Sequence, residues 1–182
     1  MPNPTKLSTL TSLSPLDGRY GEQLADVTSI FSELHLILMR LTIEIEWLKT
    51  LAHEPKIKEV KPLSHENLKF LHNIIAEFDT KDINHIKELE KQTNHDVKAV
   101  EYFLKEKLAA NKKLTAYQEF IHFGCTSDDI NNLSYAITLA KARDEILLPM
   151  MEKIILHLGK MAQNYAELPM LARTHGQPAS PT

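Results

Sequence analysis

Apolar residues recur every three or four positions along most of this chain, a spacing that predicts amphipathic helices rather than strands. Residues 1–28 lack this pattern and carry three prolines and a turn-forming LDGRYG segment, so we expect them to be irregular. The first helix is expected from its N-cap at Ser29 to about Ala52, and the loop HEPKIKEVKP follows it.

Four shorter helical segments are expected before the C-terminal third. Ser64 is the expected N-cap of one that reaches about Phe78, and Thr80 the expected N-cap of a short, charged one. Apolar spacing predicts another over about residues 95–110 and a brief one over about 117–123.

The longest predicted helix begins at Thr126 and meets no terminator until Pro169. Thr126 and Asp129 have the spacing of a capping box. A period of 3.5 residues predicts a left-handed bundle with partner helices. Pro149 lies inside this helix and is expected to kink it. The apolar heptad positions are Ile130, Leu133, Ile137, Ala140, Leu147, Met151, Ile154, Leu158, Met161 and Tyr165.

Around Pro149 the helix is apolar on nearly every face, and such a helix must be buried all round. The preceding residues offer only short helices to cover it, so we expect burial by further segments, by other subunits, or by both. The expected fold class is all-α. An N-terminal helical domain is expected over residues 1–115 and the start of a central long-helix bundle domain over residues 116–182.

Composition narrows the possible functions. The 182 residues carry a net charge of −3, which argues against nucleic-acid binding but leaves small anionic ligands possible. Cys125 is the single cysteine, so no disulfide can form within the chain and a reducing compartment is favoured. No signal-peptide run and no stretch of ~20 apolar residues is present, so we expect a soluble, cytoplasmic protein that binds no membrane.

Four polar clusters stand at helix boundaries or turns, where binding residues concentrate. They are LDGRYG (16–21), TNHD (93–96), HFGCTSDD (122–129) and RTHGQP (173–178). Each also has a purely structural interpretation.

Two of these clusters precede predicted helices. Thr126 and Ser127 lie where free amide groups and the helix dipole favour anions, although Thr126 could be only an N-cap. His95 and Asp96 could ligate a metal, orient an acid or base, or cap a helix. The sequence has no HExxH motif and no cysteine cluster, so a metal site has little support.

The other two clusters lie on turns. Arg19 could bind a phosphate through two donors, beside Tyr20, or both could belong to a plain surface turn. His175 lies on a turn bounded by glycine and proline, where it could be a general acid or base or an ordinary loop residue. We interpret the histidines outside the clusters as structural, namely His35, His53, His65, His72, His85 and His157.

Taken together, SPLDGRYG, TNHDVKAVEYFLKE, FIHFGCTSDDINN and RTHGQPASPT resemble the adenylosuccinate lyase family of the aspartase/fumarase superfamily. The likeness runs in the same order from about Leu13 to Thr182, and THGQPA and TSDDINN are its more specific parts. It implies a homotetramer whose central bundle takes long helices from every subunit. It also implies β-elimination of fumarate from adenylosuccinate, giving AMP, and from the succinylated aminoimidazole carboxamide ribotide of purine biosynthesis, with no metal or cofactor.

The resemblance implies roles for named residues as well. The substrate-binding residues would be Arg19, Tyr20, Asn94, His95, Asp96, Thr126 and Ser127. The first pair would bind the nucleotide phosphate region, the next three would contact or orient substrate, and the last pair would hold a succinyl carboxylate. His175 would be the general acid at the leaving nitrogen, with His95 tuning it. His122 is a weaker candidate, which would support the residues that contact the substrate without contacting it itself.

The family's catalytic base is a serine in a downstream stretch similar to SSxMPxKxNP, which these 182 residues lack. We therefore expect an N-terminal fragment of a longer enzyme, inactive alone and associating as dimers or larger species. The alternatives are another fumarate-releasing lyase such as argininosuccinate lyase, an HD-type metal phosphohydrolase using His95 and Asp96, and a non-catalytic helical interaction module. Metal content would test the second of these and nucleotide binding the third.

Overall fold

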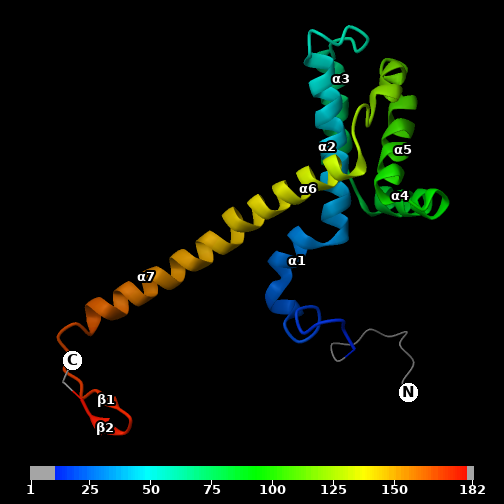
Figure 1. The fold of residues 1–182 in the computed structure, drawn as a ribbon. Coiled ribbons are helices and arrows are strands. Elements are labelled where there is room, and N and C mark those ends of the chain that lie inside the picture. The colour runs from blue at the N-terminus through cyan, green and yellow to red at the C-terminus, as the bar shows by residue number, and fades with distance from the viewer. Residues whose placement is uncertain (1–10, 180–182) are drawn as a thin grey trace. The chain divides into compact units, whose positions relative to one another are not determined.

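The computed structural model describes residues 11–179, and the expected irregularity of residues 1–10 lies outside that range, as do residues 180–182. The described chain is all-α, with one short hairpin near its C-terminal end (Figure 1), which confirms the predicted fold class. The elements are η1 (Gly21–Leu24), α1 (Ala25–Phe31), α2 (Glu33–His53), α3 (His65–Ala76), α4 (Thr80–Thr93), α5 (Asp96–Ala109), η2 (Thr115–Phe120), α6 (Ser127–Ala142), η3 (Arg143–Leu147), α7 (Leu148–Asn164), β1 (Arg173–Thr174) and β2 (Gln177–Pro178).

The chain forms two compact units, of which one ends at Ala142 and the other begins at Arg143. The domain boundary expected between residues 115 and 116 is not tested by this division into units and stays a prediction.

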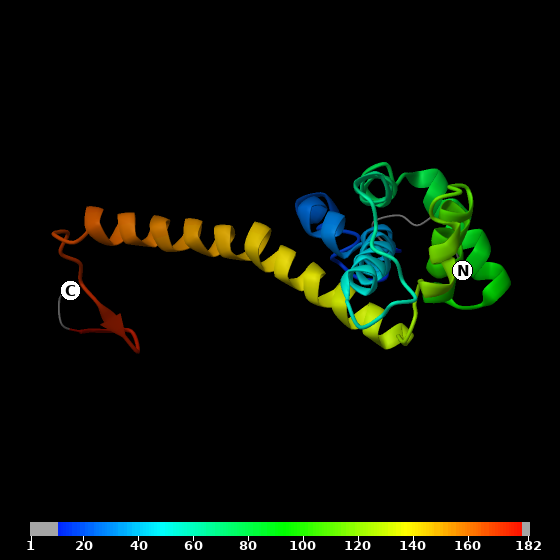
Figure 2. The same cartoon turned by 90° about the horizontal axis from the view of Figure 1, so that it is seen from above.

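Helix α2 is the centre of the first unit, and Figure 2 shows it nearly end-on. It contacts α1, α3, α5, α6 and η2. Its apolar side chains recur at helical spacing and meet those of α3 and α5 in one core. Removing these side chains from water is the main favourable contribution to folding of this unit. The largest fully buried apolar residues include Leu41, Ile45, Leu48, Leu71, Phe103, Leu104 and Leu108.

Helix starts in this unit depend on side chains that accept backbone hydrogen bonds. The predicted cap at Ser64 is confirmed, because its hydroxyl oxygen accepts the amide hydrogen of Asn67 at 3.2 Å. The predicted cap at Thr80 is wrong. Asp79 takes that place, and its carboxylate accepts two amides while Asp82 accepts the amide of Asp79 in return. This reciprocal pairing satisfies more free amides than a lone threonine can.

The expected N-cap at Ser29 is also wrong, because Ser29 lies inside α1 and its hydroxyl donates to the carbonyl of Asp26. Ser32 is extended, caps α2 and separates the two helices. The expectation of irregular structure up to residue 28 is therefore wrong from Gly21 onward, where η1 and α1 form.

Helix α6 buries a different stripe from the predicted heptad seam. Its buried residues follow a spacing of four and face α1, α2 and α5; they are Ile130, Ser134, Thr138 and Ala142. Of the seam positions, Ile130 is buried, whereas Leu133 and Ile137 are exposed. The seam side of α6 is thus open to solvent in this chain.

The second unit begins with η3, a π-helical turn, and continues as α7. The helical stretch predicted to reach residue 168 ends at Asn164. Pro149 lies in the first turn of α7, where its missing N–H costs little, and the irregularity expected near it is the π-helical turn just before.

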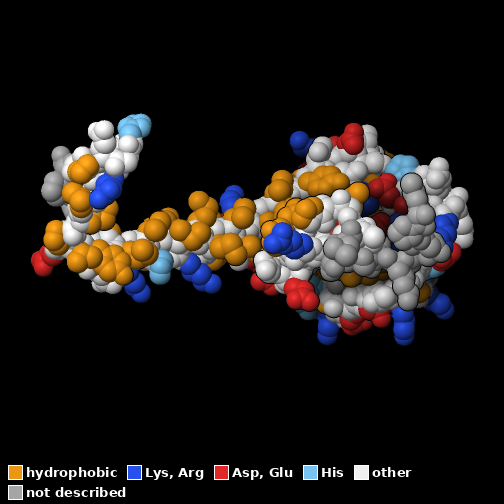
Figure 3. All heavy atoms as spheres, turned by 90° about the horizontal axis from the view of Figure 1, so that it is seen from below, with side chains coloured by type: hydrophobic (Ala, Val, Ile, Leu, Met, Phe, Trp, Pro, Cys, Tyr) orange, Lys and Arg blue, Asp and Glu red, His pale blue; other side chains and the backbone are white. Residues whose placement is uncertain are grey.

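All side chains of α7 described here are exposed except that of Pro149, and Figure 3 shows orange apolar side chains along its visible face. The exposed apolar residues include Leu148, Met150, Met151, Ile154, Ile155, Leu156, Leu158 and Met161. Among residues 11–179 no helix has the length and apolarity that a membrane crossing requires.

The hairpin near the C-terminal end has a two-residue loop. Arg173 pairs with Pro178, and Thr174 pairs with Gln177. The loop residues His175 and Gly176 both have positive φ, 49° and 75°. Positive φ at both loop positions defines a type I′ turn, in which asparagine or glycine is preferred and histidine is uncommon. His175 is held, exposed, at the tip.

Candidate functional site at two helix N-termini

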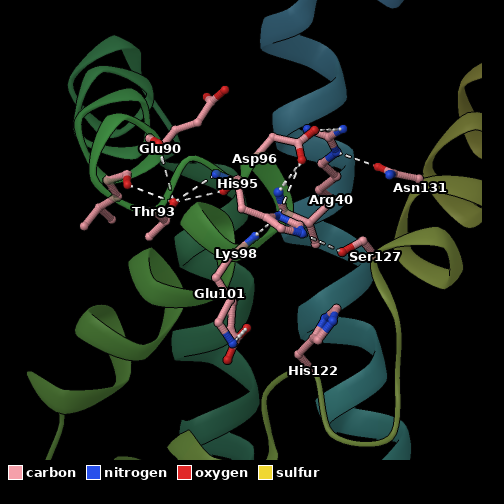
Figure 4. Close-up of polar contacts among 12 residues, drawn as sticks. Arg40, Glu90, Thr93, His95, Asp96, Lys98, Glu101, His122, Ser127 and Asn131 are labelled. Carbon is pink, nitrogen blue, oxygen red and sulfur yellow. Dashed lines mark hydrogen bonds and ion pairs between the residues drawn. The ribbon is translucent and has the colours of Figure 1, made fainter.

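The first turns of α5 and α6 meet through side chains (Figure 4). His95 is the N-cap of α5, and its Nδ1 atom accepts the amide hydrogen of Lys98 at 3.2 Å. Its Nε2 atom lies 3.2 Å from the Oγ atom of Ser127, the first residue of α6. Because Nδ1 is an acceptor, the neutral ring carries its proton on Nε2 and donates it to Ser127.

Contacts among its own residues hold the turn before α5 in place. Asn94 closes α4 in the left-handed conformation, with φ of 50°, which asparagine tolerates better than most residues. The Thr93 hydroxyl donates to the carbonyl of His95 and accepts the amide of His95. An open cavity of about 520 Å³ lies beside this turn and is lined by Lys87, Glu90, Lys91, Asn94, His95 and Asp96.

Asp96 belongs to a chain of polar contacts that links three helices. Its carboxylate lies 2.6 Å from the guanidinium of Arg40 on α2, and Arg40 Nε donates to the Oδ1 atom of Asn131 on α6 at 2.8 Å. Partial burial acts to raise the pKa of Asp96. The amide of Val97 and the charge of Arg40 outweigh that effect and hold the pKa below its usual value. Asp96 is therefore a carboxylate whose charge is already balanced.

His122 forms a second histidine–carboxylate pair, which is more buried than that of His95 and Asp96. Its Nδ1 atom lies 2.6 Å from the Oε1 atom of Glu44 on α2, whose side chain is 0% exposed. Burial raises the pKa of Glu44, although the hydrogen bond and charge of His122 act in the opposite direction. The backbone of His122 has a φ of 59°, which is uncommon for a residue other than glycine. The contact with Glu44 holds the His122 ring in place.

At the start of α6, the amide of Thr126 donates to the carboxylate of Asp129 at 2.7 Å. The spacing of a capping box predicted this pairing. Ser127 follows directly and faces His95, so Asn94, His95, Asp96, Thr126 and Ser127 lie in one region of the first unit.

The remaining predicted site residues are Arg19, Tyr20 and His175. The guanidinium of Arg19 stands over the ring of Tyr20, 5.3 Å from its centroid. Among residues 11–179 no hydrogen bond, ion pair or ring contact joins either side chain to the His95 region. His175 belongs to the second unit, so its relation to that region stays a prediction.

Sequence reasoning missed three polar residues that organise the site, namely Arg40, Glu44 and Asn131. A signal was present for two of them. Arg40 and Glu44 are four residues apart within the otherwise apolar face of α2, and buried charges are rare unless they are paired.

A metal site is disfavoured by the hydrogen bonding. Both ring nitrogens of His95 are engaged by Lys98 and Ser127, and Asp96 is engaged by Arg40. In the part of the chain that the structure describes, no group of three or more histidine, cysteine, aspartate or glutamate residues could hold a metal ion.

The fold and this region define an all-α protein with a polar site at the N-termini of two helices. The chain belongs to the lyase family, which it matches over residues 18–182. This membership argues against the metal phosphohydrolase interpretation.

Similar proteins include the adenylosuccinate lyases of Haemophilus influenzae and Vibrio cholerae, each 52% identical over 177 residues. The adenylosuccinate lyase of Escherichia coli (strain K12) is 49% identical over 177 residues. Each alignment covers 97% of this chain and 39% of the relative, so the chain spans about two fifths of the length of these proteins. The predicted likeness to adenylosuccinate lyases is confirmed.

Proposed function

We propose that this chain forms part of an adenylosuccinate lyase. Its reaction would eliminate fumarate from adenylosuccinate and from the succinylated aminoimidazole carboxamide ribotide of purine biosynthesis. The observation that carries the proposal is the contact of His95 with Ser127 at two helix N-termini, in a chain about half identical to adenylosuccinate lyases.

The geometry at Ser127 suits a carboxylate of the substrate. The Ser127 oxygen accepts the Nε2 hydrogen of His95, so its own hydroxyl hydrogen is free to donate. The start of α6 adds the positive end of the helix dipole. We assign the succinyl carboxylate to Thr126 and Ser127. Asn94 and His95 would contact the substrate beside them.

Asp96 has a supporting part in this proposal. A carboxylate near an anionic substrate would repel it unless its charge were balanced. Arg40 supplies that balance at 2.6 Å and also binds Asn131 of α6. Asp96 would thus orient the turn that carries His95 without weakening anion binding.

The elimination needs a base beside a carboxylate and an acid at the departing nitrogen. We assign the acid to His175, whose ring the type I′ turn holds exposed at the hairpin tip. Arg19 and Tyr20, on an exposed turn, would bind the nucleotide phosphate. Acid–base chemistry of this kind requires no metal or cofactor.

Assembly and location complete the proposal. The exposed apolar side chains of α7 support burial against other subunits in a homotetramer. The single, unpaired Cys125 supports a reducing, cytoplasmic setting.

A hybrid enzyme tests the function directly. The hybrid joins this chain to the part of the Escherichia coli relative that the alignment does not cover. We expect it to release fumarate from adenylosuccinate, measured chromatographically, while the uncovered part alone releases none. A hybrid that forms a folded oligomer but leaves adenylosuccinate intact would contradict the proposal, and argininosuccinate tested in parallel would reveal a different lyase.

A further inference from the structure

Glu44 is a fully buried acid that the proposed chemistry does not use. It lies on α2 between apolar core residues, with 0% of its side chain exposed. Its Oε1 atom contacts His122 Nδ1 at 2.6 Å, and its buried Oε2 atom has no hydrogen-bond partner. An ionised carboxylate in such surroundings is unfavourable unless a cation balances it.

His122 contacts Glu44 directly, and Lys98 on α5 acts on Glu44 electrostatically. From α5, Glu101 acts on Glu44 electrostatically and adds to the effect of burial in raising its pKa. Lys98 and Lys105 are already paired with Glu101, at 2.7 and 2.9 Å. In the loop before α6, burial chiefly raises the pKa of the Cys125 thiol, and the charge of Glu44 adds to this effect. A net negative Glu44–His122 pair is therefore disfavoured.

A pair with no net charge fixes the position of one proton. The pair is either a carboxylic acid that donates to Nδ1 of a neutral ring or a carboxylate that accepts from Nδ1 of a protonated ring. In both forms the Nε2 atom of His122 carries a hydrogen. It becomes a bare acceptor only when the pair loses a further proton and gains a buried negative charge.

His122 lies on the loop that leads into α6, and one edge of its ring is free. The ring is 17% exposed although Nδ1 faces the buried Glu44, so the exposed part is the opposite edge. Within residues 11–179 no hydrogen bond engages Nε2, and this atom is not one of the buried polar atoms without a partner. A turn closed by the Cys125 amide and the His122 carbonyl at 3.2 Å leads directly into Ser127 (Figure 4).

We propose that Glu44 is a positioning residue that anchors the His122 ring through Nδ1 and keeps its Nε2–H directed, as a donor, at an anionic group bound at the N-terminus of α6. The identity of that group as a substrate carboxylate rests on the proposed function. The location of the proton on Nε2 of His122 is independent of the proposed function.

The first test locates the proton in this chain by ¹⁵N NMR of its histidines. At about pH 8 we expect the Nε2 atom of His122 to carry a hydrogen, because a net negative charge on the buried pair is disfavoured. A bare Nε2 with a protonated Nδ1 would overturn the proposal, whatever the hybrid enzyme does. This readout needs no substituted protein.

The second test is a double-mutant cycle in the hybrid enzyme. Glu44→Leu should raise the KM for adenylosuccinate roughly tenfold, because one hydrogen bond to a charged group is lost. The same substitution should have no further effect beside His122→Ala, since Glu44 acts through that ring. Independent, additive effects on KM would overturn the proposal.

A matched control exists on the surface. Glu106 contacts the ring of His85, and both side chains are about half exposed. Glu106→Leu should leave KM unchanged, which separates the effect of the buried pair from that of removing any glutamate beside a histidine. If the unsubstituted hybrid released no fumarate, the proposed function would fail, and the NMR result would still decide the proton position.

Discussion

The Nε2 atom of His95 lies 3.2 Å from the Oγ atom of Ser127, and this contact joins the first turn of α5 to the first turn of α6. The same ring caps α5 through Nδ1. His95 therefore has two separable roles, one in local stability and one in orienting Ser127.

Substitutions at His95 should separate these roles. Asparagine can cap a helix, but its side chain is too short to contact Ser127 as the imidazole does. His95→Asn should therefore keep most of the stability and lose activity. His95→Ala should lose both, with a fall of about 1 kcal/mol in the free energy of unfolding from the missing cap. Urea denaturation of the chain and fumarate release by the hybrid measure the two effects. A hybrid carrying His95→Asn that kept full activity would contradict the role given to the ring.

Arg40 should contribute to stability through Asp96 and Asn131. Its side chain is 7% exposed, and Arg40→Met leaves the oxygen of Asn131 and part of Asp96 without a donor. We expect the free energy of unfolding to fall by about 1–3 kcal/mol, as for other partly buried groups that lose a partner. The control is Arg143→Met, which breaks an exposed pair with Asp144 and should leave urea denaturation unchanged.

Stability should depend on the ionisation of Asp96. Its pKa in the folded chain is lower than usual, because Val97 and Arg40 outweigh the effect of burial. Its contribution is therefore complete above the unfolded pKa of about 3.9 and is lost as the pH falls through that value toward the folded pKa. Asp96→Asn should destabilise the chain at neutral pH, and the difference from the unsubstituted chain should shrink in acid.

Urea denaturation at a series of pH values measures this difference. Glu152→Gln, at an exposed position on α7, should give a curve parallel to that of the unsubstituted chain. A constant gap between the Asp96→Asn curve and the unsubstituted one down to about pH 2 would show that Asp96 does not ionise as described.

The exposed apolar surface of α7 should drive association. Ile154 and Leu158 are each more than half exposed and lie one helical turn apart. We expect dimers or larger species in light scattering, and the double substitution Ile154→Glu, Leu158→Glu should shift them toward monomer. Gln163→Glu with Asn164→Asp adds the same charge without removing apolar surface and should leave association intact. A monodisperse monomer of the unsubstituted chain at all concentrations would contradict this expectation.

A substitution at His175 can remove the proposed general acid without changing the conformation of the hairpin. Asparagine is favoured in a type I′ turn, so His175→Asn should preserve the hairpin. Loss of a general acid should lower kcat of the hybrid roughly 10²–10⁴-fold. The hairpin amide shifts in NMR check the fold, and a kcat within a few-fold of the unsubstituted value would remove His175 from the acid role.

The sequence by itself determined the helical class, most helix positions and the polar clusters, because these follow from local spacing and turn chemistry. His95, Thr126 and Ser127 were identifiable because each stands where a periodic apolar stretch begins. Helix starts at Ser29 and Thr80 were misplaced because competing caps at Ser32 and Asp79 satisfy the free amides better.

Only the tertiary structure decided which of these residues meet. Arg40 and Asn131 are 91 residues apart, and His122 and Glu44 are 78 apart, so no local pattern could pair them. Their pairing follows from the packing of α5 and α6 against α2, which buries two charges and obliges each to find a partner. Local spacing selects helices and their caps, whereas the burial of charge, set by packing, selects the contacts that shape the site.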